Sequence, residues 1–169
     1  MRVVSKQRNS KMCFICGMEN PIGLKAQFYN MEDGSVVTPI KYLPEHQSFT
    51  NRVHGGISVA TLDELSMRAY WVTNENGFGV TTSMSVKYRK PVPYNVEIIG
   101  RGIIESDTSR FLKAHAMILD KDGNVYTEAE VNYIKMPVEK IVKDIDFHDE
   151  MAYLIEDNIK EIDFNLLKK

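Results

Sequence analysis

The chain has few cysteines and no excess of charge of either sign. It contains two cysteines in 169 residues, too few for the disulfide framework that holds small secreted domains together. The formal net charge is −2, so the strongly basic surface typical of proteins that bind nucleic acid or anionic lipid is missing. We therefore expect neither a disulfide-rich secreted domain nor a nucleic-acid-binding protein.

Long hydrophobic runs are also missing. No run approaches the roughly 18 apolar residues of a membrane-spanning helix, and the basic N-terminus lacks the apolar core of a secretory signal. Hydrophobic residues nevertheless make up 43% of the chain, which is enough for the core of one ordinary globular domain. These features predict a soluble, cytoplasmic protein with no membrane partner.

Changes of hydrophobic period divide the chain into strands, one long helix and a tail. From residue 56 to about residue 71 the apolar positions cover most of a helix circumference, which predicts a helix buried on nearly all sides. Alternating apolar residues and turn signals predict strands before and after this helix. The expected strands cover 24–31, 35–43, 80–89, 96–105, 110–119 and 125–136.

Pro137 ends the last expected strand. Apolar residues between 139 and 169 are spaced for one or two amphipathic helices, so we interpret 137–169 as a helical extension. The preceding domain covers 1–136, with 1–23 as its lead-in. An antiparallel sheet beside one helix is an α+β arrangement in which the sheet must curl around the helix to cover it. The edge strands of such a sheet are expected to pair with a second copy.

Cys13 and Cys16 form a CxxC pair in the lead-in. One such pair supplies only two metal ligands, and the four histidines show no zinc-finger spacing relative to it. A thioredoxin-like role would call for a βαβ context, which the pattern lacks. We therefore predict no metal site and interpret the pair as a structural lead-in to the first strand.

The expected helix carries two adjacent carboxylates, Asp63 and Glu64. Residues three or four apart share a helix face, so Glu64 is expected to form a solvated or interface ion pair with Arg68. Asp63 shares its face with small and apolar residues instead and has no local partner. A carboxylate in such a place is costly unless it is hydrogen-bonded or used chemically. Asp63 is therefore a candidate catalytic acid, the alternative being an acid bonded to a neighbouring turn.

His54, Gly55 and Gly56 directly precede the apolar part of this helix. The start of a helix presents unpaired backbone N–H groups and the positive end of the helix dipole, and glycine lets a ligand approach them closely. A substrate carbonyl placed there would be polarised. Ordinary turn chemistry is the alternative for the two glycines. His54 would either position the carbonyl or cap the helix and pack.

The chain resembles the hot-dog-fold acyl-CoA thioesterases of the phenylacetate-pathway type. The resemblance runs from about residue 13 to 136, and it rests on four segments in the family's order: CFICGMENPIGLKAQFY (13–29), HQSFTNRVHGGISVATLDE (46–64), GVTTSMSVKYRKPVP (79–93) and DKDGNVYTEAEVNYIK (120–135). It implies a curved antiparallel sheet around a central helix. It also implies a homodimer or dimer of dimers with interface active sites, and hydrolysis of acyl-CoA to acid and CoA with no cofactor beyond the CoA of the substrate.

The resemblance assigns roles to individual residues. Asp63 matches the family's catalytic acid, acting as nucleophile or as base for water, and Gly55 matches the donor to the oxyanion. Gln47 matches a residue that orients the nucleophile or water, with Ser48 and Asn51 as substitutes. Thr81 matches a hydroxyl that bonds the attacking water.

The assignment of Thr81 conflicts with the strand pattern. The expected alternation puts Val80 and Thr82 on the apolar face of the strand, so Thr81 should point away from the helix. Only a bulge or the end of the strand would bring it to Asp63.

Coenzyme A carries several phosphates, so the mouth of the site should offer cations. Protection of a sheet edge is the alternative reason for lysine and arginine at strand ends. The expected substrate-binding residues are Gly56, Lys87, Arg89, Lys90 and Arg110.

Two other functions fit the same expected fold. A hot-dog scaffold can serve as a non-catalytic acyl-CoA sensor or binding module. It can also carry hydratase or dehydratase chemistry on an acyl thioester, which would need a histidine positioned as base. The face that carries Asp63 argues mildly against this last reading.

Overall fold

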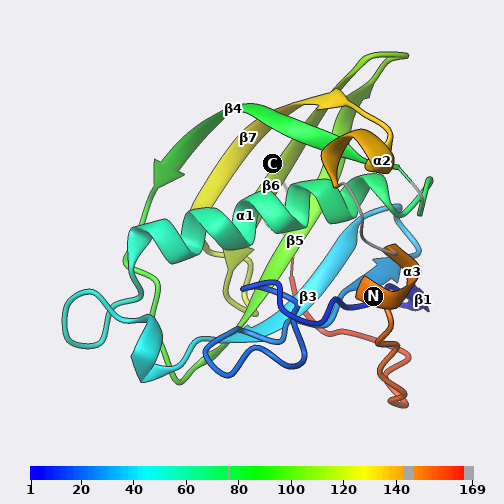
Figure 1. Cartoon of the computed structure of the whole chain (residues 1–169). Helices are drawn as coiled ribbons and strands as arrows, with labels where there is room; N and C mark the ends of the chain where they lie inside the picture. The colour runs from blue at the N-terminus through cyan, green and yellow to red at the C-terminus, as the bar shows by residue number, and fades with distance from the viewer. Residues whose placement is uncertain (76, 143–146, 166–169) are drawn as a thin grey trace.

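One antiparallel sheet curves around one long helix in this protein (Figure 1). The structure, a computed structural model, describes residues 1–75, 77–142 and 147–165. Within them the seven strands are ordered β1-β2-β3-β5-β6-β7-β4, and all neighbours pair antiparallel. Their bounds are β1 Val3–Lys6, β2 Tyr29–Met31, β3 Val36–Lys41, β4 Gly79–Tyr88, β5 Glu97–Asp107, β6 Phe111–Leu119 and β7 Val125–Lys135.

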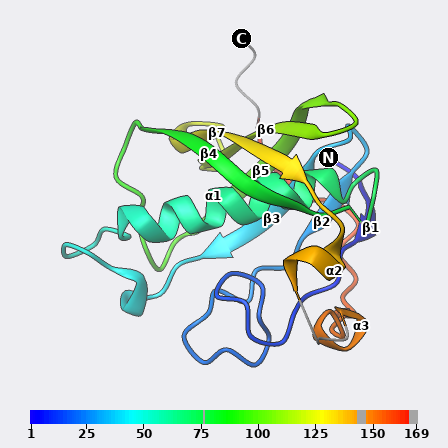
Figure 2. The ribbon, with the colours of Figure 1, turned by 45° about the horizontal axis from the view of Figure 1, so that its top comes forward.

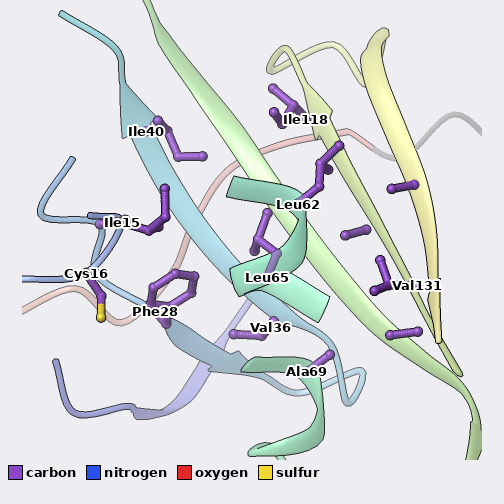
Figure 3. Close-up of a cluster of buried hydrophobic side chains, with 14 of the residues drawn as sticks. Ile15, Cys16, Phe28, Val36, Ile40, Leu62, Leu65, Ala69, Ile118 and Val131 are labelled. Atoms are coloured by element: carbon purple, nitrogen blue, oxygen red, sulfur yellow. The ribbon is translucent and has the colours of Figure 1, made fainter. Parts of the chain in front are cut away.

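The long helix α1 (Gly55–Tyr70) lies across the concave face of the sheet (Figures 1 and 2). Its Leu62 and Leu65 are fully buried in the main core between helix and sheet (Figure 3). Burial of each leucine side chain contributes about 1.5–3 kcal/mol. The helix approaches β5 so closely that a Cβ at Gly102 would lie 2.5 Å from the Leu65 carbonyl oxygen. The absence of a side chain at this position therefore sets the helix–sheet distance.

The expected α+β wrap is confirmed, and most expected elements agree with it within about two residues. Two N-terminal differences stand out. The strand expected over 24–31 is reduced to β2, although Ala26 and Phe28 are buried in the core. The lead-in contains an unexpected strand, β1, which pairs with β2. A short 3₁₀ helix, Pro44–His46, precedes α1.

The C-terminal tail is less helical than expected. Among the described tail residues, 137–142 and 147–165, only α2 (Val138–Ile141) and α3 (Phe147–Glu150) are helical, so the prediction of helix is wrong for 151–165. Burial alternates residue by residue through much of this stretch, because the segment is extended. The parts of the expected helices over 143–146 and 166–169 lie outside the described residues.

The extended tail covers the outer face of the sheet. Ile162 and Phe164 pack into a second apolar cluster with residues of β2, β3, β5 and β6. The tail also runs antiparallel to the N-terminus, where the Val3 N–H donates to the Lys160 carbonyl at 2.8 Å. The tail therefore completes the core on the side that α1 does not cover. None of the helices in the described ranges combines the length and apolar character needed to cross a membrane.

Candidate active site

Asp63 lies in the middle of α1 and is held by two hydroxyl groups from the sheet. Thr81 Oγ1 donates to Asp63 Oδ1 at 2.9 Å. Tyr133 Oη donates to the same oxygen at 3.1 Å and contacts the Asp63 carbonyl oxygen at 3.0 Å. Both hydroxyls use Oδ1, and no described residue donates to Oδ2. The carboxylate is thus fixed in orientation, with one oxygen left for water or substrate.

Tyr133 was not among the expected site residues. It belongs to β7 and is almost completely buried. Burial, assisted by the charge of Asp63, raises the pKa of Tyr133 well above its usual range, so the phenol stays protonated and can donate at neutral pH. The alternation of β7 indicates from sequence that Tyr133 points inwards. It does not indicate that Asp63 is the partner of the hydroxyl, because that depends on how α1 packs on the sheet.

Thr81 reaches Asp63 through a β-bulge. The β4–β7 register shifts between Thr81 and Ser83, which reverses the alternation of β4 at this point. Thr81 therefore faces the helix, and Met84 and Val86 face the core beyond the bulge. The alternation expected for β4 is wrong at its start, where Val80 is 42% exposed. The bulge that the sequence required for a Thr81–Asp63 contact is present.

The N-terminus of α1 is the second part of the site. His54 is the N-cap, and its Nδ1 accepts the Gly56 N–H at 3.0 Å. The Ile57 and Ser58 amides donate to the His54 carbonyl. The Gly55 N–H is one of the initial helix amides, which have no acceptor within the helix. The cap therefore engages Gly56, expected to bind substrate, and leaves Gly55 as the amide that can meet a carbonyl.

Gln47 lies beside the same turn. It forms an isolated antiparallel bridge with Val53, and its exposed side chain accepts a long hydrogen bond from Tyr94 Oη at 3.5 Å. Gln47, for which an orienting role is predicted, thus lies near the start of α1, where Gly55 is. In this single chain it does not approach Asp63 through any described contact.

A pocket of about 290 Å³ opens next to Gly55. It includes two of the expected cations, Arg89 and Lys90. Arg89 Nε also donates to Glu128 at 2.9 Å, so the carboxylate partly neutralises the charge of Arg89. Lys90 is therefore the cation of this pocket with more charge available for a ligand. Tyr88 closes one side and donates from Oη to the Gly55 carbonyl at 3.3 Å. The remaining lining residues are Val53, Ser58, Pro91, Val92 and Thr127.

The other two expected cations lie elsewhere. Lys87 lines a hollow of about 330 Å³ on the sheet together with three glutamates, which offset its positive charge. Arg110 lies near the start of β6, where its carbonyl accepts the Lys135 N–H and its guanidinium stacks on Phe111. Lys135 pairs with the first residue of β4, so Arg110 is at the far end of that strand from the Gly55 pocket.

The expected residues thus form two separate groups within one chain. Asp63 and Thr81 make one group, and Gly55, His54 and Gln47 make the other. Asp63 follows Gly55 by two helical turns, which corresponds to about 12 Å along the helix axis at about 1.5 Å per residue. One copy of the chain does not bring the carboxylate to the amide of its own helix start.

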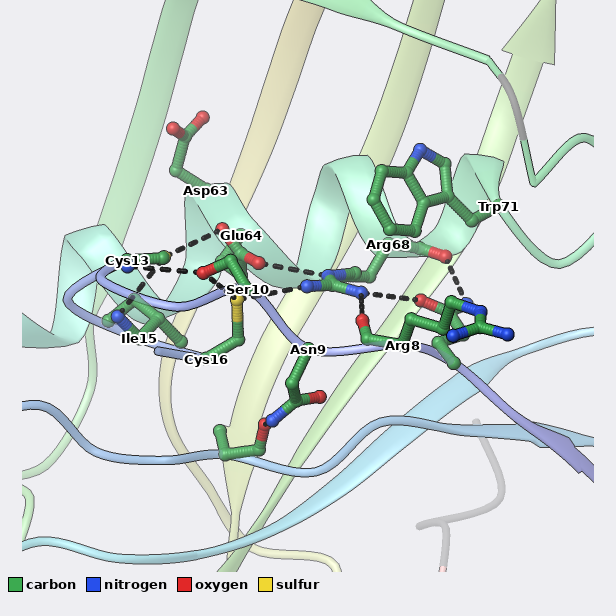
Figure 4. A network of polar contacts seen from close by, with 12 residues as sticks. Arg8, Asn9, Ser10, Cys13, Ile15, Cys16, Asp63, Glu64, Arg68 and Trp71 are labelled. Carbon is green, nitrogen blue, oxygen red and sulfur yellow. Dashed lines mark hydrogen bonds and ion pairs between the residues drawn. The ribbon is translucent and has the colours of Figure 1, made fainter. Parts of the chain in front are cut away.

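Arg68 differs most from expectation. The ion pair with Glu64 is present, with Arg68 Nε 2.9 Å from Glu64 Oε1, but Arg68 is only 2% exposed rather than solvated. Its guanidinium lies between the rings of Phe28 and Trp71, 4.7 and 4.4 Å from their centroids. It also donates to the Arg8 carbonyl at 2.7 Å. Figure 4 shows that this network joins the N-terminal segment to α1.

Comparison with known proteins supports one family. Residues 50–127 match the family model described as the thioesterase superfamily. No sequence among the curated proteins matches the chain.

Solved structures of similar fold carry thioesterase names. One crystal structure of a thioesterase superfamily protein is 24% identical, with a TM-score of 0.68, over 73% of this chain and 63% of that one, which is less than two thirds of its length. Zebra fish thioesterase superfamily member 2 is 18% identical, with a TM-score of 0.61, over 70% of this chain and 86% of that one. A putative thioesterase from Ralstonia eutropha JMP134 is described as phenylacetic acid degradation-related. It is 18% identical, with a TM-score of 0.58, over 66% of this chain and 85% of that one.

Proposed function

We propose that this protein, in which residues 50–127 match the thioesterase superfamily model and the sheet and helix form a hot-dog fold, hydrolyses the thioester bond of an acyl-CoA. The observation that carries the proposal is the Asp63 carboxylate, which two hydroxyls hold by a single oxygen. An acid fixed in this way is suited to act on one face of a bound thioester.

In the proposed reaction, Asp63 removes a proton from water, or attacks the carbonyl carbon itself. The new C–O bond forms as the carbonyl becomes an oxyanion, and collapse of this intermediate breaks the C–S bond. If Asp63 acts as the base, the proton that it takes from water passes to the leaving CoA sulfur, and the acyl group leaves as the free acid. If Asp63 attacks the carbonyl itself, water then hydrolyses the resulting anhydride between the acyl group and Asp63. That step releases the free acid and restores the carboxylate, and the remaining proton of the water goes to the CoA thiolate. Thr81 and Tyr133 hold the carboxylate, and Gln47 orients water or the acyl group.

The oxyanion is stabilised by the Gly55 N–H and the positive end of the α1 dipole. One such donor is worth about 2.7–4 kcal/mol in other acyl-transfer sites. Because Gly55 and Asp63 of one chain are two helical turns apart, the proposed active site combines Asp63 of one copy with Gly55 of another.

The proposed homodimer forms through β4. This strand is an edge of the sheet, and much of it is exposed, including Val80 and Tyr88. Unpaired backbone groups on such an edge favour pairing with another strand. Antiparallel pairing of two β4 strands about a two-fold axis would run the two α1 helices in opposite directions, so that each helix start points along the other helix. A dimer of dimers remains part of the proposal.

The CoA phosphates would meet Arg89 and Lys90 at the pocket beside Gly55. Both cations come directly after β4, the strand proposed to pair with the second copy. Lys87 and Arg110 lie outside this pocket, and a role for them in binding requires the second copy.

The Asp63→Asn variant tests the proposal. Turnover of a panel of acyl-CoAs is followed by a thiol-reactive dye that detects released CoA. We expect the variant to lose turnover by roughly 10²- to 10⁴-fold, the usual contribution of a positioned acid–base group, with an unchanged melting temperature. The matched control is Asp122→Asn, which makes the same change in the exposed turn before β7.

Three results would contradict the proposal. Equal turnover by Asp63→Asn and wild type would remove Asp63 from the mechanism. Saturable binding of acyl-CoA by the wild type without release of CoA would favour a binding module, and addition of water to an enoyl-CoA would favour hydratase chemistry.

A further inference from the structure

The CxxC pair forms a compact turn against α1. The Gly17 N–H donates to the Cys13 carbonyl at 2.8 Å, and the Cys13 N–H donates to Ser10 Oγ at 3.1 Å. A Cβ at Gly17 would lie 2.3 Å from the Cys13 carbonyl oxygen, so the turn in this form requires glycine. The Ile15 N–H points at Cys13 Sγ at 3.3 Å. The backbone thus presents a donor to the sulfur of the first cysteine.

The two thiols face each other and one carboxylate. Both cysteines are free, and the Sγ atoms of Cys13 and Cys16 and one Glu64 carboxylate oxygen all lie within 4.8 Å of one another. Cys13 is half-buried and donates towards Glu64 Oε2 at 3.8 Å. Cys16 is 1% exposed. A reagent from solution therefore meets Cys13 before Cys16. Figure 4 shows both cysteines in the turn beside Glu64.

A buried cation already occupies this cluster. Arg68 Nη2 donates to Cys16 Sγ at 3.0 Å, and Nε donates to Glu64 Oε1 at 2.9 Å. Two of the three groups that could bind a metal are thus used by a guanidinium that Phe28 and Trp71 hold in place. A divalent ion would have to sit beside this fixed positive charge. The guanidinium instead suits a sulfur that becomes negative during thiol chemistry.

The two sulfurs have opposite acid–base character. The hydrogen bond from Cys16, together with the backbone donors, lowers the pKa of Cys13 to about 7, although burial and Glu64 oppose the shift. The hydrogen bond to Cys13 and burial raise the pKa of Cys16, and Arg68 opposes this. An accessible thiolate beside a buried thiol is the arrangement needed for attack by the first and resolution by the second.

We propose that Cys13 and Cys16 are a reversible dithiol–disulfide site that reacts with low-molecular-weight disulfides, the half-buried Cys13 attacking and the buried Cys16 resolving. The Cys13 thiolate attacks one sulfur of the small disulfide, which forms a mixed disulfide and releases one thiolate. The Cys16 sulfur then attacks Cys13 Sγ, the second small thiol leaves, and it takes up the proton that Cys16 loses. Two protein thiols are oxidised, and one small disulfide is reduced to two thiols.

This site is distinct from the proposed hydrolysis. None of its sulfur contacts involves Asp63, Thr81 or Gly55. Glu64, which contacts Cys13 Sγ, is the neighbour of Asp63 in the chain.

The test uses the full chain with glutathione disulfide as the probe. Reduced, desalted protein is incubated with glutathione disulfide and quenched with N-ethylmaleimide, and intact mass then counts the groups attached. Because the chain has two cysteines, we expect oxidised wild type to carry neither glutathione nor maleimide, and dithiothreitol to restore two reactive thiols in the unfolded protein. Cys16→Ser should stop at one glutathione on Cys13. Cys13→Ser should gain none while folded.

Other outcomes would overturn the proposal. These are a wild type that keeps glutathione without closing the disulfide, a wild type that does not react, or adducts on Cys16 in Cys13→Ser as fast as on Cys13 in Cys16→Ser. Retention of one zinc ion per chain, with protection of both thiols until a chelator is added, would assign a metal site instead. Circular dichroism confirms that each variant is folded.

Discussion

Thr81 Oγ1 lies 2.9 Å from Asp63 Oδ1, although Thr81 belongs to a strand whose regular alternation would point it away from the helix. A single bulge in β4 turns Thr81 towards the helix and allows this contact. The carboxylate therefore depends on a local irregularity of the sheet for one of its two hydroxyl donors.

Replacement of Thr81 by valine should lower turnover. The Thr81→Val variant keeps the volume of the side chain and removes the donor to Asp63. We expect kcat for acyl-CoA hydrolysis to fall by roughly 10- to 100-fold, the loss expected for one hydrogen bond to a charged group, with little change in KM. Steady-state kinetics measure both parameters.

The matched control is Thr82→Val. Thr82 is the adjacent residue of the bulge, and its Oγ1 donates to the Asn132 carbonyl instead. If both variants lose the same activity, the effect belongs to the bulge and not to the Asp63 contact.

Removal of the Lys90 charge should weaken binding of the nucleotide part of the substrate. For Lys90→Met we expect KM for acyl-CoA to rise by roughly two- to fivefold, because exposed ion pairs are weak, and the effect to shrink at high salt. KM for an acyl-pantetheine, which lacks the nucleotide phosphates, should not change. Kinetics with both substrates make the comparison.

Lys121→Met is the control for Lys90. It removes a lysine of the turn between β6 and β7, which pairs with Glu97 at 2.8 Å. An equal rise of KM for both thioesters in Lys90→Met would contradict a phosphate contact.

Alkylation of Cys13 should depend on pH in a characteristic way. The pKa of Cys13 is lowered to about 7, so its thiolate forms as the pH rises through that value, below the ~8.5 of an ordinary cysteine. The rate of iodoacetamide modification of the folded protein should therefore be low under acidic conditions and reach its plateau earlier than for a free thiol. Mass spectrometry of quenched samples measures this rate.

Glu64→Gln should move that pH profile downwards. The negative charge of Glu64 raises the pKa of Cys13, and its loss should favour the thiolate. The exposed residue Glu45 supplies the control, Glu45→Gln. A shift of the profile to higher pH in Glu64→Gln would contradict this effect of the Glu64 charge.

The extended tail should contribute to stability. Ile162 is buried on the outer face of the sheet, and we expect Ile162→Ala to lower the free energy of unfolding in urea by about 2 kcal/mol. Ile159→Ala is the control, since Ile159 is 39% exposed. Equal stability of the two variants would mean that the tail does not hold the second cluster together.

Local sequence patterns determined much of the fold. The 3.6-residue period predicted a helix from 56 to about 71, one residue from the observed bounds of α1 at each end, and alternation with turn residues placed β4 to β7 within about two residues of their ends. The same helical geometry singled out Asp63, because its acid lies on a face without a local partner. The helix, the strands and the position of Asp63 on its face depend on residues only a few positions apart in the chain, so they can be predicted from local sequence.

Only the tertiary structure decided which distant groups meet. The bulge that turns Thr81 towards Asp63, and the Tyr133 hydroxyl on the same oxygen, depend on the register of β4 and β7. The burial of Arg68 between two rings depends on where the N-terminal segment packs. The tail is extended because its alternating apolar residues pack on the face of the sheet that α1 does not cover. The free energy gained by burying these side chains outweighs the local helix propensity.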